Sequence, residues 1–220
     1  MPNDDNFTFE NGYFGYVSPV FVDIRSSSIL FSDGDKVKVS KIIRSFTFEV
    51  IEILRDDKHL REIGIRGDCV CAICTTPQIG DVHRIADRTW HINTFMGMLN
   101  ALLKQNNLPN ISVGIGMSTA EELVVKAGRK GTGINNKVWI GKAVSLASNL
   151  SSLGNTNGIC ALVYSDCSYT NFINQLVEEC GEKAKGWFTK IDNNRSVGTF
   201  YHANVTKTAF NDWVEAGMNN

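Results

Sequence analysis

Two apolar runs separated by only two residues constrain the fold more than any other part of this chain. Leu60–Arg66 and Cys69–Cys74 each have the length of a strand, and the Gly-Asp pair between them is typical of a tight hairpin turn. Before the hairpin, apolar residues recur every three or four positions across Lys41–Leu54, which predicts an amphipathic helix. The preceding run, Val17–Ile24, is apolar enough for a buried strand. This part of the chain therefore predicts a β-α-β-β unit.

The rest of the chain continues the alternation of helices and strands. Asp81–Lys104 is the clearest helix, because its apolar residues alternate steps of three and four without a break. A further helix is predicted at Ala143–Leu153, and another runs from an N-cap at Ser165 to about Cys180. We therefore expect one α+β domain over residues 1–220, with a mixed, mostly antiparallel sheet flanked by helices. Shorter strands are predicted at Ile111–Gly116, Leu123–Ala127, Val138–Gly141 and Ile159–Tyr164, followed by a closing hairpin at Trp187–Ile191 and Thr199–Ala203.

The composition limits the classes of partner. A formal net charge of -1 argues against binding to nucleic acids or membrane surfaces, since both normally need a basic excess. Residues 1–6 are acidic where a signal peptide would be basic, and no apolar run approaches the roughly 18 residues of a membrane span. We therefore expect a cytoplasmic protein that binds a small molecule, with neither nucleic acid nor membrane as a partner.

Six cysteines raise the question of metal binding. Cys69, Cys71 and Cys74 lie within one predicted strand, where two side chains point to one face and the third to the other. That arrangement suits a metal ion poorly, and a cytosolic chain usually keeps such thiols reduced. We expect the cysteines to be small core residues.

Two aspartates at strand ends are the strongest candidates for chemistry. Asp23 lies near the end of the apolar run Phe21–Ile24, and Asp68 lies at the tip of the predicted hairpin. Each has an ordinary explanation, because aspartate also favours helix caps and turns. Brought side by side by the β-α-β-β unit, the two carboxylates could instead hold divalent metal ions over a nucleoside triphosphate.

Four short motifs carry a resemblance to a known family. They are Phe21-Val22-Asp23-Ile24, Ile65-Arg66-Gly67-Asp68-Cys69, Ser112-Val113-Gly114-Ile115-Gly116 and Ile140-Gly141-Lys142-Ala143-Val144-Ser145-Leu146-Ala147. Their order and spacing over about residues 17–165 resemble the catalytic domain of the class III nucleotidyl cyclases. The resemblance implies a ferredoxin-like βαββαβ core and a homodimer with its active site at the interface. It also implies cyclisation of a nucleoside triphosphate to a 3′,5′-cyclic monophosphate and pyrophosphate.

The resemblance assigns roles to individual residues. Asp23 and Asp68 would hold two Mn²⁺ or Mg²⁺ ions, aided by the backbone carbonyl of Ile24, to activate the ribose 3′-hydroxyl and neutralise the leaving pyrophosphate. Ser145 stands where the family usually has a transition-state asparagine, and Asn149 stands where it has an arginine. Ser145 can still donate one hydrogen bond, but Asn149 brings no positive charge. Phosphate contacts are predicted for Arg25, Ser26, Ser27, Ser28, Arg66, Gly67 and Lys126, with Arg129, Lys130, Lys137 and Lys142 as further basic candidates.

The positions that read a purine base in the family also differ. Gly64 and Val138 stand there, and neither side chain can form a hydrogen bond with adenine or guanine. A compact domain with the turn Asp-Ile-Arg-Ser-Ser-Ser and the segment Val-Lys-Ala-Gly-Arg-Lys-Gly resembles the bacterial pyrimidine cyclases of Pycsar antiphage defence. That resemblance implies cyclic UMP or cyclic CMP as the product, with uridylate favoured, and a separate effector that senses it.

Other interpretations stay open from the sequence. A catalytically inactive cyclase-like module that binds a nucleotide or a protein would explain Ser145 and Asn149, but not the two retained aspartates. A purine cyclase with unusual base recognition is a further alternative. So is another palm-type enzyme such as a diguanylate cyclase, although the hairpin tip lacks a Gly-Gly-Asp/Glu-Glu-Phe-like motif. Trp139 could stack on a base, but a tryptophan in a short strand is more often a core residue.

Overall fold

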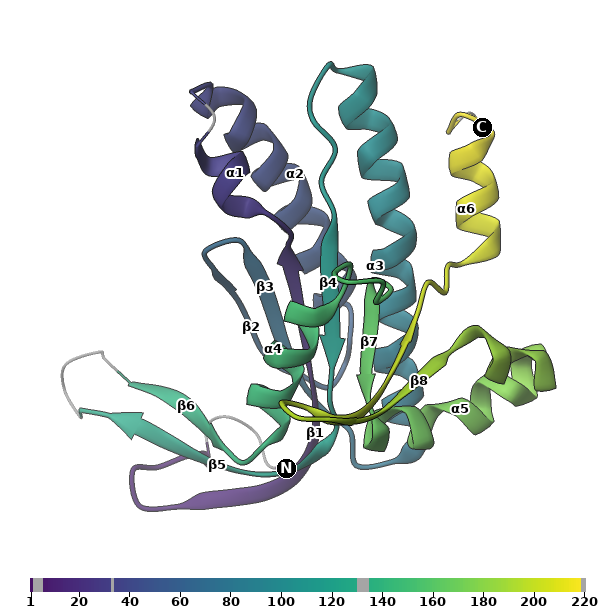
Figure 1. Ribbon diagram of the computed structural model, residues 1–220. Coiled ribbons are helices and arrows are strands. Elements are labelled where there is room, and N and C mark those ends of the chain that lie inside the picture. The colour runs from purple at the N-terminus through teal and green to yellow at the C-terminus, as the bar shows by residue number, and fades with distance from the viewer. Residues whose placement is uncertain (2–5, 33, 130–134, 219–220) are drawn as a thin grey trace.

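Figure 1 shows the computed structural model of the protein, which describes residues 1, 6–32, 34–129 and 135–218. The strands are β1 (Gly12–Ile24), β2 (Leu60–Arg66), β3 (Cys69–Thr75), β4 (Val113–Met117), β5 (Ala120–Gly128), β6 (Asn135–Ile140), β7 (Leu162–Ser165), β8 (Thr189–Asn194) and β9 (Gly198–Ala203). The helices are α1 (Ser27–Ser32), α2 (Lys36–Arg55), α3 (Ile79–Gln105), α4 (Ala143–Leu153), α5 (Asp166–Cys180) and α6 (Thr208–Glu215), with a 3-10 helix at Glu182–Trp187. Among these described helices, none has the length and apolar character needed to cross a membrane.

The described strands join into one sheet with a ferredoxin-like βαββαβ core. The strands follow the order β2-β3-β1-β4-β7-β9-β8, and β5 and β6 extend the sheet from the first half of β1. Within β2-β3-β1-β4 every neighbouring pair is antiparallel, whereas β4 and β7 are parallel. Helices α2 and α3 cover one face of this core and α4 lies on the other. The α+β fold with a mixed, mostly antiparallel sheet is confirmed.

Strand β1 is longer than the sequence predicted. It begins at Gly12 instead of Val17, because its first half pairs with β5 from Gly12 opposite Val125 to Val17 opposite Ala120. Strand β6 pairs with the other edge of β5, so residues 12–17, β5 and β6 form a three-stranded arm that projects from the domain (Figure 1). Alternate residues in this half of β1 are exposed, so it lacks the continuous apolar run that predicts a buried strand.

Helix α2 starts earlier than the predicted boundary at Lys41. Its first residue is Lys36, and the Asp35 side chain caps it by accepting hydrogen bonds from the backbone N–H groups of Val37 and Lys38, both at 3.1 Å. Lys36, Val37 and Lys38 are exposed, but Val39 is buried, so the apolar spacing of the helix extends back to Val39. The N-cap at Asp35, four residues before the first buried side chain, marks the true start of the helix.

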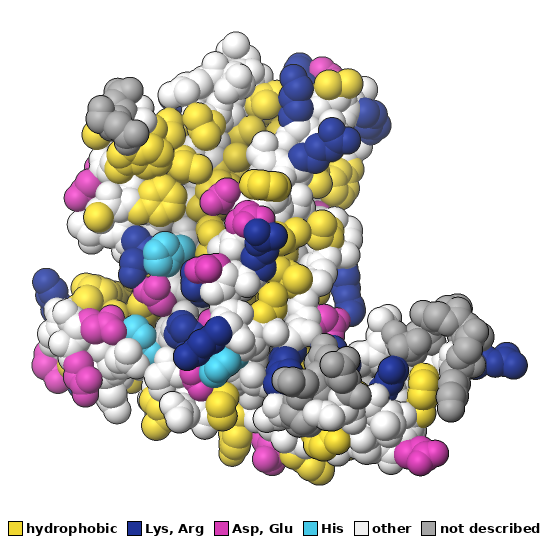
Figure 2. Space-filling view, turned by 180° about the vertical axis from the view of Figure 1, so that it is seen from behind, with side chains coloured by type: hydrophobic (Ala, Val, Ile, Leu, Met, Phe, Trp, Pro, Cys, Tyr) yellow, Lys and Arg dark blue, Asp and Glu magenta, His cyan; other side chains and the backbone are white. Residues whose placement is uncertain are grey.

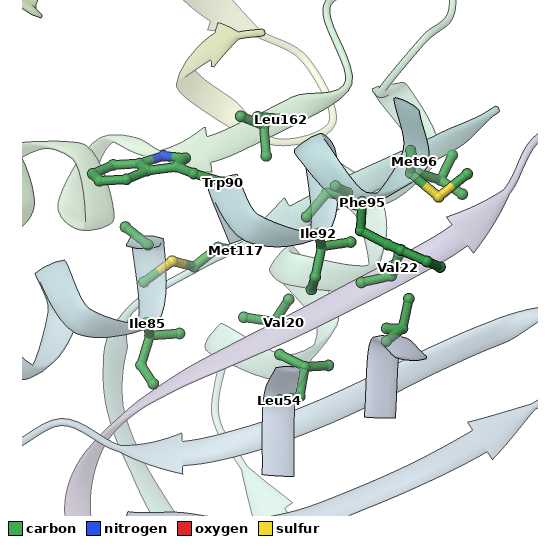
Figure 3. Close-up of a cluster of buried hydrophobic side chains, with 14 of the residues drawn as sticks. Val20, Val22, Leu54, Ile85, Trp90, Ile92, Phe95, Met96, Met117 and Leu162 are labelled. Atoms are coloured by element: carbon green, nitrogen blue, oxygen red, sulfur yellow. The ribbon is translucent and has the colours of Figure 1, made fainter. Parts of the chain in front are cut away.

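The main core lies between the sheet and helices α2 and α3. Val20 and Val22 of β1 share it with Ile85 and Ile92 of α3, and each of these side chains is at most 1% exposed (Figure 3). Burial of one such side chain contributes about 1.5–3 kcal/mol to stability. Because side chains alternate along a strand, Asp23 faces the opposite side of the sheet, toward α4.

Ion pairs connect the end of α2 to the start of α3. Arg84 donates hydrogen bonds to the buried carboxylate of Asp57 at 2.6 Å and to Asp81 at 2.5 Å. Removing one member of such a buried pair typically costs about 3–5 kcal/mol. Figure 2, which shows the domain from behind, has acidic and basic side chains interspersed across the middle of this face.

Helix α4 approaches the sheet closely over β4. A Cβ atom added to Gly114 would lie 2.0 Å from the backbone oxygen of Ser151, and one added to Gly116 would lie 2.2 Å from that of Ala147. Only glycine leaves room for a helix backbone at this distance. Since Gly114 pairs with Asp23, α4 packs over the end of β1 that carries this aspartate.

We expect Gly116→Ala to destabilise the domain by about 1–3 kcal/mol, because the added methyl group must push α4 away from β4. Gly97→Ala is the matched control. Gly97 is exposed within α3, a Cβ there meets no atom within 4 Å, and alanine should stabilise the helix by about 0.5–1 kcal/mol. Urea unfolding followed by circular dichroism measures both changes. Equal stability of Gly116→Ala and the unsubstituted chain would contradict the close packing of α4.

Candidate active site

Asp23 and Asp68 lie side by side at one end of the sheet. Asp23 pairs with Cys69 of β3 on one side and with Gly114 of β4 on the other, and Asp68 directly precedes Cys69. The backbone N–H of Ile24 donates a 3.4 Å hydrogen bond to the carbonyl of Asp68, which connects the end of β1 to the hairpin tip. The fold therefore makes neighbours of two carboxylates that are 45 positions apart in the sequence.

The surroundings of Asp23 disfavour its negative charge. Burial is the largest influence and raises the pKa of the Asp23 carboxyl group, the guanidinium of Arg25 lowers it, and the negative charge of Asp68 raises it again. The balance leaves this pKa above its ordinary value. A cation bound between the two carboxylates would relieve their repulsion, which is the usual reason that acidic pairs of this kind bind metal ions.

The available ligands suit a hard divalent cation. The two carboxylates and the backbone carbonyl of Ile24 are oxygen ligands, which Mg²⁺ and Mn²⁺ prefer. Across the residues that the structure describes, no group of three or more His, Cys, Asp or Glu side chains could hold a metal ion. Asp23, Asp68 and the carbonyl of Ile24 would fill only part of the coordination shell of such an ion, which leaves its other positions for water and the phosphates of a substrate.

Arg25 contacts Asp23 in three ways. Its Nη2 forms an ion pair with the Asp23 carboxylate, and the backbone carbonyl of Asp23 accepts hydrogen bonds from Nε at 3.3 Å and Nη2 at 3.2 Å. Its Nη1 donates a 2.9 Å hydrogen bond to the carbonyl of Ser152, in the last turn of α4. A residue predicted to bind phosphate is thus held against a candidate metal ligand.

The serine turn after Arg25 leads into helix α1. Ser26 has a left-handed backbone with a φ of +54°, and its carbonyl accepts two hydrogen bonds from backbone N–H groups of α1. Ser27 and Ser28 form the first turn of this helix. Arg25 and Ser26 line a cavity of about 340 Å³ together with the loop before β4. Four of the residues predicted to bind phosphate therefore follow directly from the strand end that carries Asp23.

The hairpin tip holds two more of these residues, Arg66 and Gly67. Gly67 has a φ of +64°, which the first residue of a two-residue hairpin turn requires. Arg66 is exposed. Burial raises the pKa of the nearby Cys71 thiol, and the positive charge of Arg66 partly offsets this rise. Positive charge thus lies close to Asp68, on the α4 side of the sheet.

A second cavity, of about 230 Å³, lies beside the hairpin. Its lining includes Glu62 and Arg66 of β2 with Lys137 and Trp139 of β6, and the indole N–H of Trp139 donates a 2.9 Å hydrogen bond to the Glu62 carboxylate. Gly64 lies on the same face of β2, and a Cβ added to it would meet no atom within 4 Å. Trp139 is half-buried against a small apolar cluster, as the sequence favoured. Glu62 was missed from the sequence, because an acid in a half-exposed strand carries no signal of its own.

Ser145 lies apart from the carboxylates of its own chain. It is exposed in the first turn of α4, where its hydroxyl donates a 3.2 Å hydrogen bond to the backbone carbonyl three residues earlier. The ion pair of Asp23 meets the other end of this helix, at Ser152, about 10 Å further along the axis. Asn149 is exposed on the same side of α4 as Ser145.

Lys126 also lies apart from Asp23. It belongs to the part of β5 that pairs with the beginning of β1, near Gly12, whereas Asp23 lies near the end of β1. Its ammonium group lies 5.4 Å from the centre of the Phe9 ring. Within one chain, Lys126 is therefore not brought to the carboxylates.

The other basic candidates are distributed over the arm and the start of α4. Lys137 donates a 2.6 Å hydrogen bond to the backbone carbonyl of Arg61 and lines the hairpin cavity. Lys142 is exposed just before α4, and Arg129 follows β5. Lys130 lies outside the described residues.

One buried acid at the start of α4 was also missed from the sequence. Glu122 is 1% exposed, and its carboxylate accepts a 2.5 Å hydrogen bond from the backbone N–H of Ala143. The same carboxylate occupies the space beside Gly141 where a side chain would otherwise lie. Strand alternation could have found it, because Glu122 shares the buried face of β5 with Val124. Its carboxylate fixes the start of α4, the helix that presents Ser145 and Asn149.

The cysteines follow the predicted strand geometry. Cys69 and Cys71 face α4, whereas Cys74 faces the main core. Burial raises the pKa of the Cys69 and Cys74 thiols to about 12. The expectation of small core residues is confirmed for Cys71 and Cys74, but it is wrong for Cys167, which is exposed on α5.

The sequence matches a family model over residues 10–171, and that family is described as the adenylate and guanylate cyclase catalytic domain. The chain belongs to this family. A uridylate cyclase from Treponema porcinum is 45% identical to the chain over 218 residues, which cover 99% of the chain and 73% of that protein. A second uridylate cyclase, from Gulbenkiania mobilis, is 27% identical over 234 residues, which cover 98% of the chain and 86% of that protein.

Solved cyclase structures share the fold of this cyclase domain. The adenylyl cyclase CyaB from P. aeruginosa superposes with a TM-score of 0.69 at 16% identity, over 88% of this chain and 95% of that one. The guanylyl cyclase Cya2 superposes with a TM-score of 0.68 at 15% identity, over 91% of this chain and 97% of that one. A class III adenylyl cyclase-like ATP-binding protein from Pseudomonas aeruginosa superposes with a TM-score of 0.66 at 13% identity, over 96% of this chain and 42% of that one. The class III cyclase fold implied by the four sequence motifs is confirmed.

We expect Asp23→Asn and Asp68→Asn each to weaken Mn²⁺ binding at least about tenfold, because each removes one of the two charged oxygen ligands. Titration of the nucleotide-free protein, followed by the electron paramagnetic resonance of unbound Mn²⁺, measures this affinity. Circular dichroism should show the fold retained, and Asp212→Asn, on the exposed side of α6, should bind like the unsubstituted chain. Unchanged affinity in both variants would exclude this pair as the metal site.

Proposed function

We propose that this cyclase domain is a phosphorus–oxygen lyase that converts UTP to cyclic UMP and pyrophosphate with divalent metal ions. The observation that carries the proposal is the pairing of Asp23 and Asp68 at one end of a class III cyclase sheet. The similarity to two uridylate cyclases supports UTP as the substrate. CTP is the second candidate, because uracil and cytosine differ by the exchange of one acceptor and one donor, which a single group can read.

In this reaction the ribose 3′-oxygen attacks the α-phosphorus in line with the leaving pyrophosphate. The new 3′ P–O bond forms as the bond between the α-phosphorus and the bridging oxygen breaks, and the hydroxyl proton passes to water or a basic group. Two bound Mn²⁺ or Mg²⁺ ions would supply Lewis acidity to the 3′-hydroxyl and the pyrophosphate. Asp23, Asp68 and the carbonyl of Ile24 would hold these ions, and Ser145 would donate a hydrogen bond to the ribose or phosphate.

The residues that flank the two aspartates are proposed to contact the triphosphate. Backbone N–H groups and hydroxyls of the serine turn are suitable donors for phosphate oxygens, and Arg25 and Ser26 line the adjacent cavity of about 340 Å³. On the hairpin side, Arg66 supplies charge and Gly67 an unhindered backbone. Ser27 and Ser28 complete the proposed phosphate site, with Lys126 supplied by a second chain.

The hairpin cavity supports a small base. Gly64 and Val138 offer no side chain that reads a purine, whereas Glu62 and Lys137 provide an acceptor and a donor at the rim of this cavity of about 230 Å³. Uracil presents two carbonyl acceptors on either side of one N–H donor, so it needs both kinds of group. We propose that the pyrimidine ring binds here.

The separation of Ser145 from Asp23 supports a homodimer with its active sites at the interface. Each site would take its carboxylates from one chain and Ser145 from the other, since the two lie at opposite ends of α4 within a chain. The arm offers a surface for association. Phe14 and Ile140 are 68% and 51% exposed, and both are cross-strand neighbours of Leu123 on one face of the arm. Contiguous exposed apolar side chains of this kind mark protein contacts.

The biological setting rests on the resemblance to the Pycsar cyclases. We propose that the cyclic nucleotide acts in the cytoplasm as a second messenger in antiviral defence, and that a separate effector protein senses it. The competing function is a nucleotide-binding module without turnover. It is favoured by Asn149, which supplies no charge, and by the likeness to a cyclase-like ATP-binding protein, whereas the retained carboxylates favour catalysis.

We expect the purified protein, incubated with Mn²⁺ and each of the four ribonucleoside triphosphates, to form cyclic UMP fastest. Mass spectrometry identifies the products, and both Asp23→Ala and Asp68→Ala should abolish them with the fold retained. Formation of no cyclic monophosphate would exclude the cyclase function, and a cyclic purine as the main product would exclude the pyrimidine assignment.

A subunit-mixing experiment tests the shared active site. Asp23→Ala and Ser145→Ala should each be nearly inactive alone, but an equal mixture after subunit exchange should regain about a quarter of full activity. Half of the random dimers are mixed, and each mixed dimer has one intact site of two. The matched control combines Asp23→Ala with Asp68→Ala, which leaves no intact site in any dimer. Equal recovery in both mixtures, or none in either, would contradict a site shared between chains.

A further inference from the structure

The guanidinium of Arg25 connects three acceptors that meet at the end of β1. These are the carboxylate of Asp23, the backbone carbonyl of Asp23, and the carbonyl of Ser152 at the end of α4. The exposed fractions of the side chains are 14% for Arg25 and 26% for Asp23. The pair is therefore largely shielded from solvent. Salt screens such a shielded ion pair less than it screens an ion pair at an exposed surface.

The ion pair conflicts with metal binding by the same carboxylate. Arg25 bonds to Oδ2 of Asp23, so a divalent cation on that carboxylate would lie within a few ångströms of a second positive charge. Such like charges repel strongly in a partly buried site. Arg25 and a metal ion therefore compete for the charge of this carboxylate.

We infer that Arg25 is a positioning residue that serves as the resident counter-ion of Asp23 and is exchanged for the metal. The inference rests on the metal site of the proposed function. Before the metal binds, the guanidinium balances the charge of Asp23 beside Asp68 and fixes the rotamer of the carboxylate. When Asp23 takes a metal ion, the guanidinium gives up Oδ2 but keeps its two backbone acceptors.

The two backbone acceptors define where the released guanidinium stays. The carbonyl of Ser152 belongs to the last turn of α4, where the helix dipole favours a positive charge. From there Arg25 still lines the cavity of about 340 Å³ beside the serine turn. It would then supply positive charge to the triphosphate, which Asn149 does not supply.

Mn²⁺ binding by the nucleotide-free protein tests the exchange without any cyclase activity. Arg25→Gln removes the competing charge, so we expect it to tighten Mn²⁺ binding about three- to tenfold in the paramagnetic resonance titration. Loss of structure alone would weaken binding, so tighter binding is a result that a merely structural role cannot produce. Arg55→Gln is the matched control, because Arg55 is exposed on α2 and pairs with Glu52.

A double-mutant cycle assigns the effect to Asp23. In an Asp23→Asn background, Arg25→Gln should change the affinity for Mn²⁺ less than about twofold, because the competing pair no longer exists. In the otherwise unsubstituted chain, Arg25→Gln should raise the KM for UTP, because the triphosphate loses contact with a positive side chain. Arg55→Gln should leave the KM unchanged. An unchanged KM would overturn the contact of Arg25 with the triphosphate but not its role as the counter-ion of Asp23.

The possible failures of this inference and of the proposed function are distinguishable. Unchanged or weaker Mn²⁺ binding by Arg25→Gln, with normal binding by the unsubstituted chain, would overturn the counter-ion role and leave the metal site intact. No Mn²⁺ binding by the unsubstituted chain would overturn the metal site and the exchange together. Tighter binding without cyclic nucleotide production would support the exchange in a binding module.

Discussion

The pairing of β1 with both β3 and β4 sets the position of the main core and of the candidate active site. This register places Asp23 opposite Cys69 and therefore beside Asp68, and it sends Val20 and Val22 into the main core. A slip of one residue would turn every side chain of β1 to the other face of the sheet. The carboxylate of Asp23 would then lie among the apolar side chains of the main core, and Val20 and Val22 would face α4. The apolar burial that stabilises the sheet thus also holds the candidate active site in place.

Helix α4 depends on this sheet at both of its ends. Glu122 bonds to the N–H of Ala143 at its start, and Arg25 bonds to the carbonyl of Ser152 at its end. The negative and positive side chains each match the sign that the helix dipole favours at that end. Between them, the glycines of β4 let the helix backbone lie against the sheet. Groups of the candidate site are therefore part of what fixes α4.

The geometry of a single chain divides the chemistry between two places. The carboxylates and the serine turn lie at one end of α4, whereas Ser145 is exposed at the other, and Lys126 lies further away on the arm. An exposed helix face beside an arm with exposed apolar side chains suits a second copy of the chain. Ser145 and Asn149, which depart from the family's usual residues, thus belong to the half of the site that the other chain would complete.

Local periodicity and the two-residue turn predict the βαββαβ order and the proximity of Asp23 and Asp68, because they leave few other ways to pair these strands. The predicted starts of β1 and α2 are too late, because the first half of β1 is alternately exposed and the first three residues of α2 are exposed. The bond of Arg25 to the carbonyl of Ser152, which is 127 positions away, and the burial of Glu122 follow instead from the packing of the whole fold. Such contacts depend on distances between segments remote in the chain, and no local pattern of residues encodes those distances.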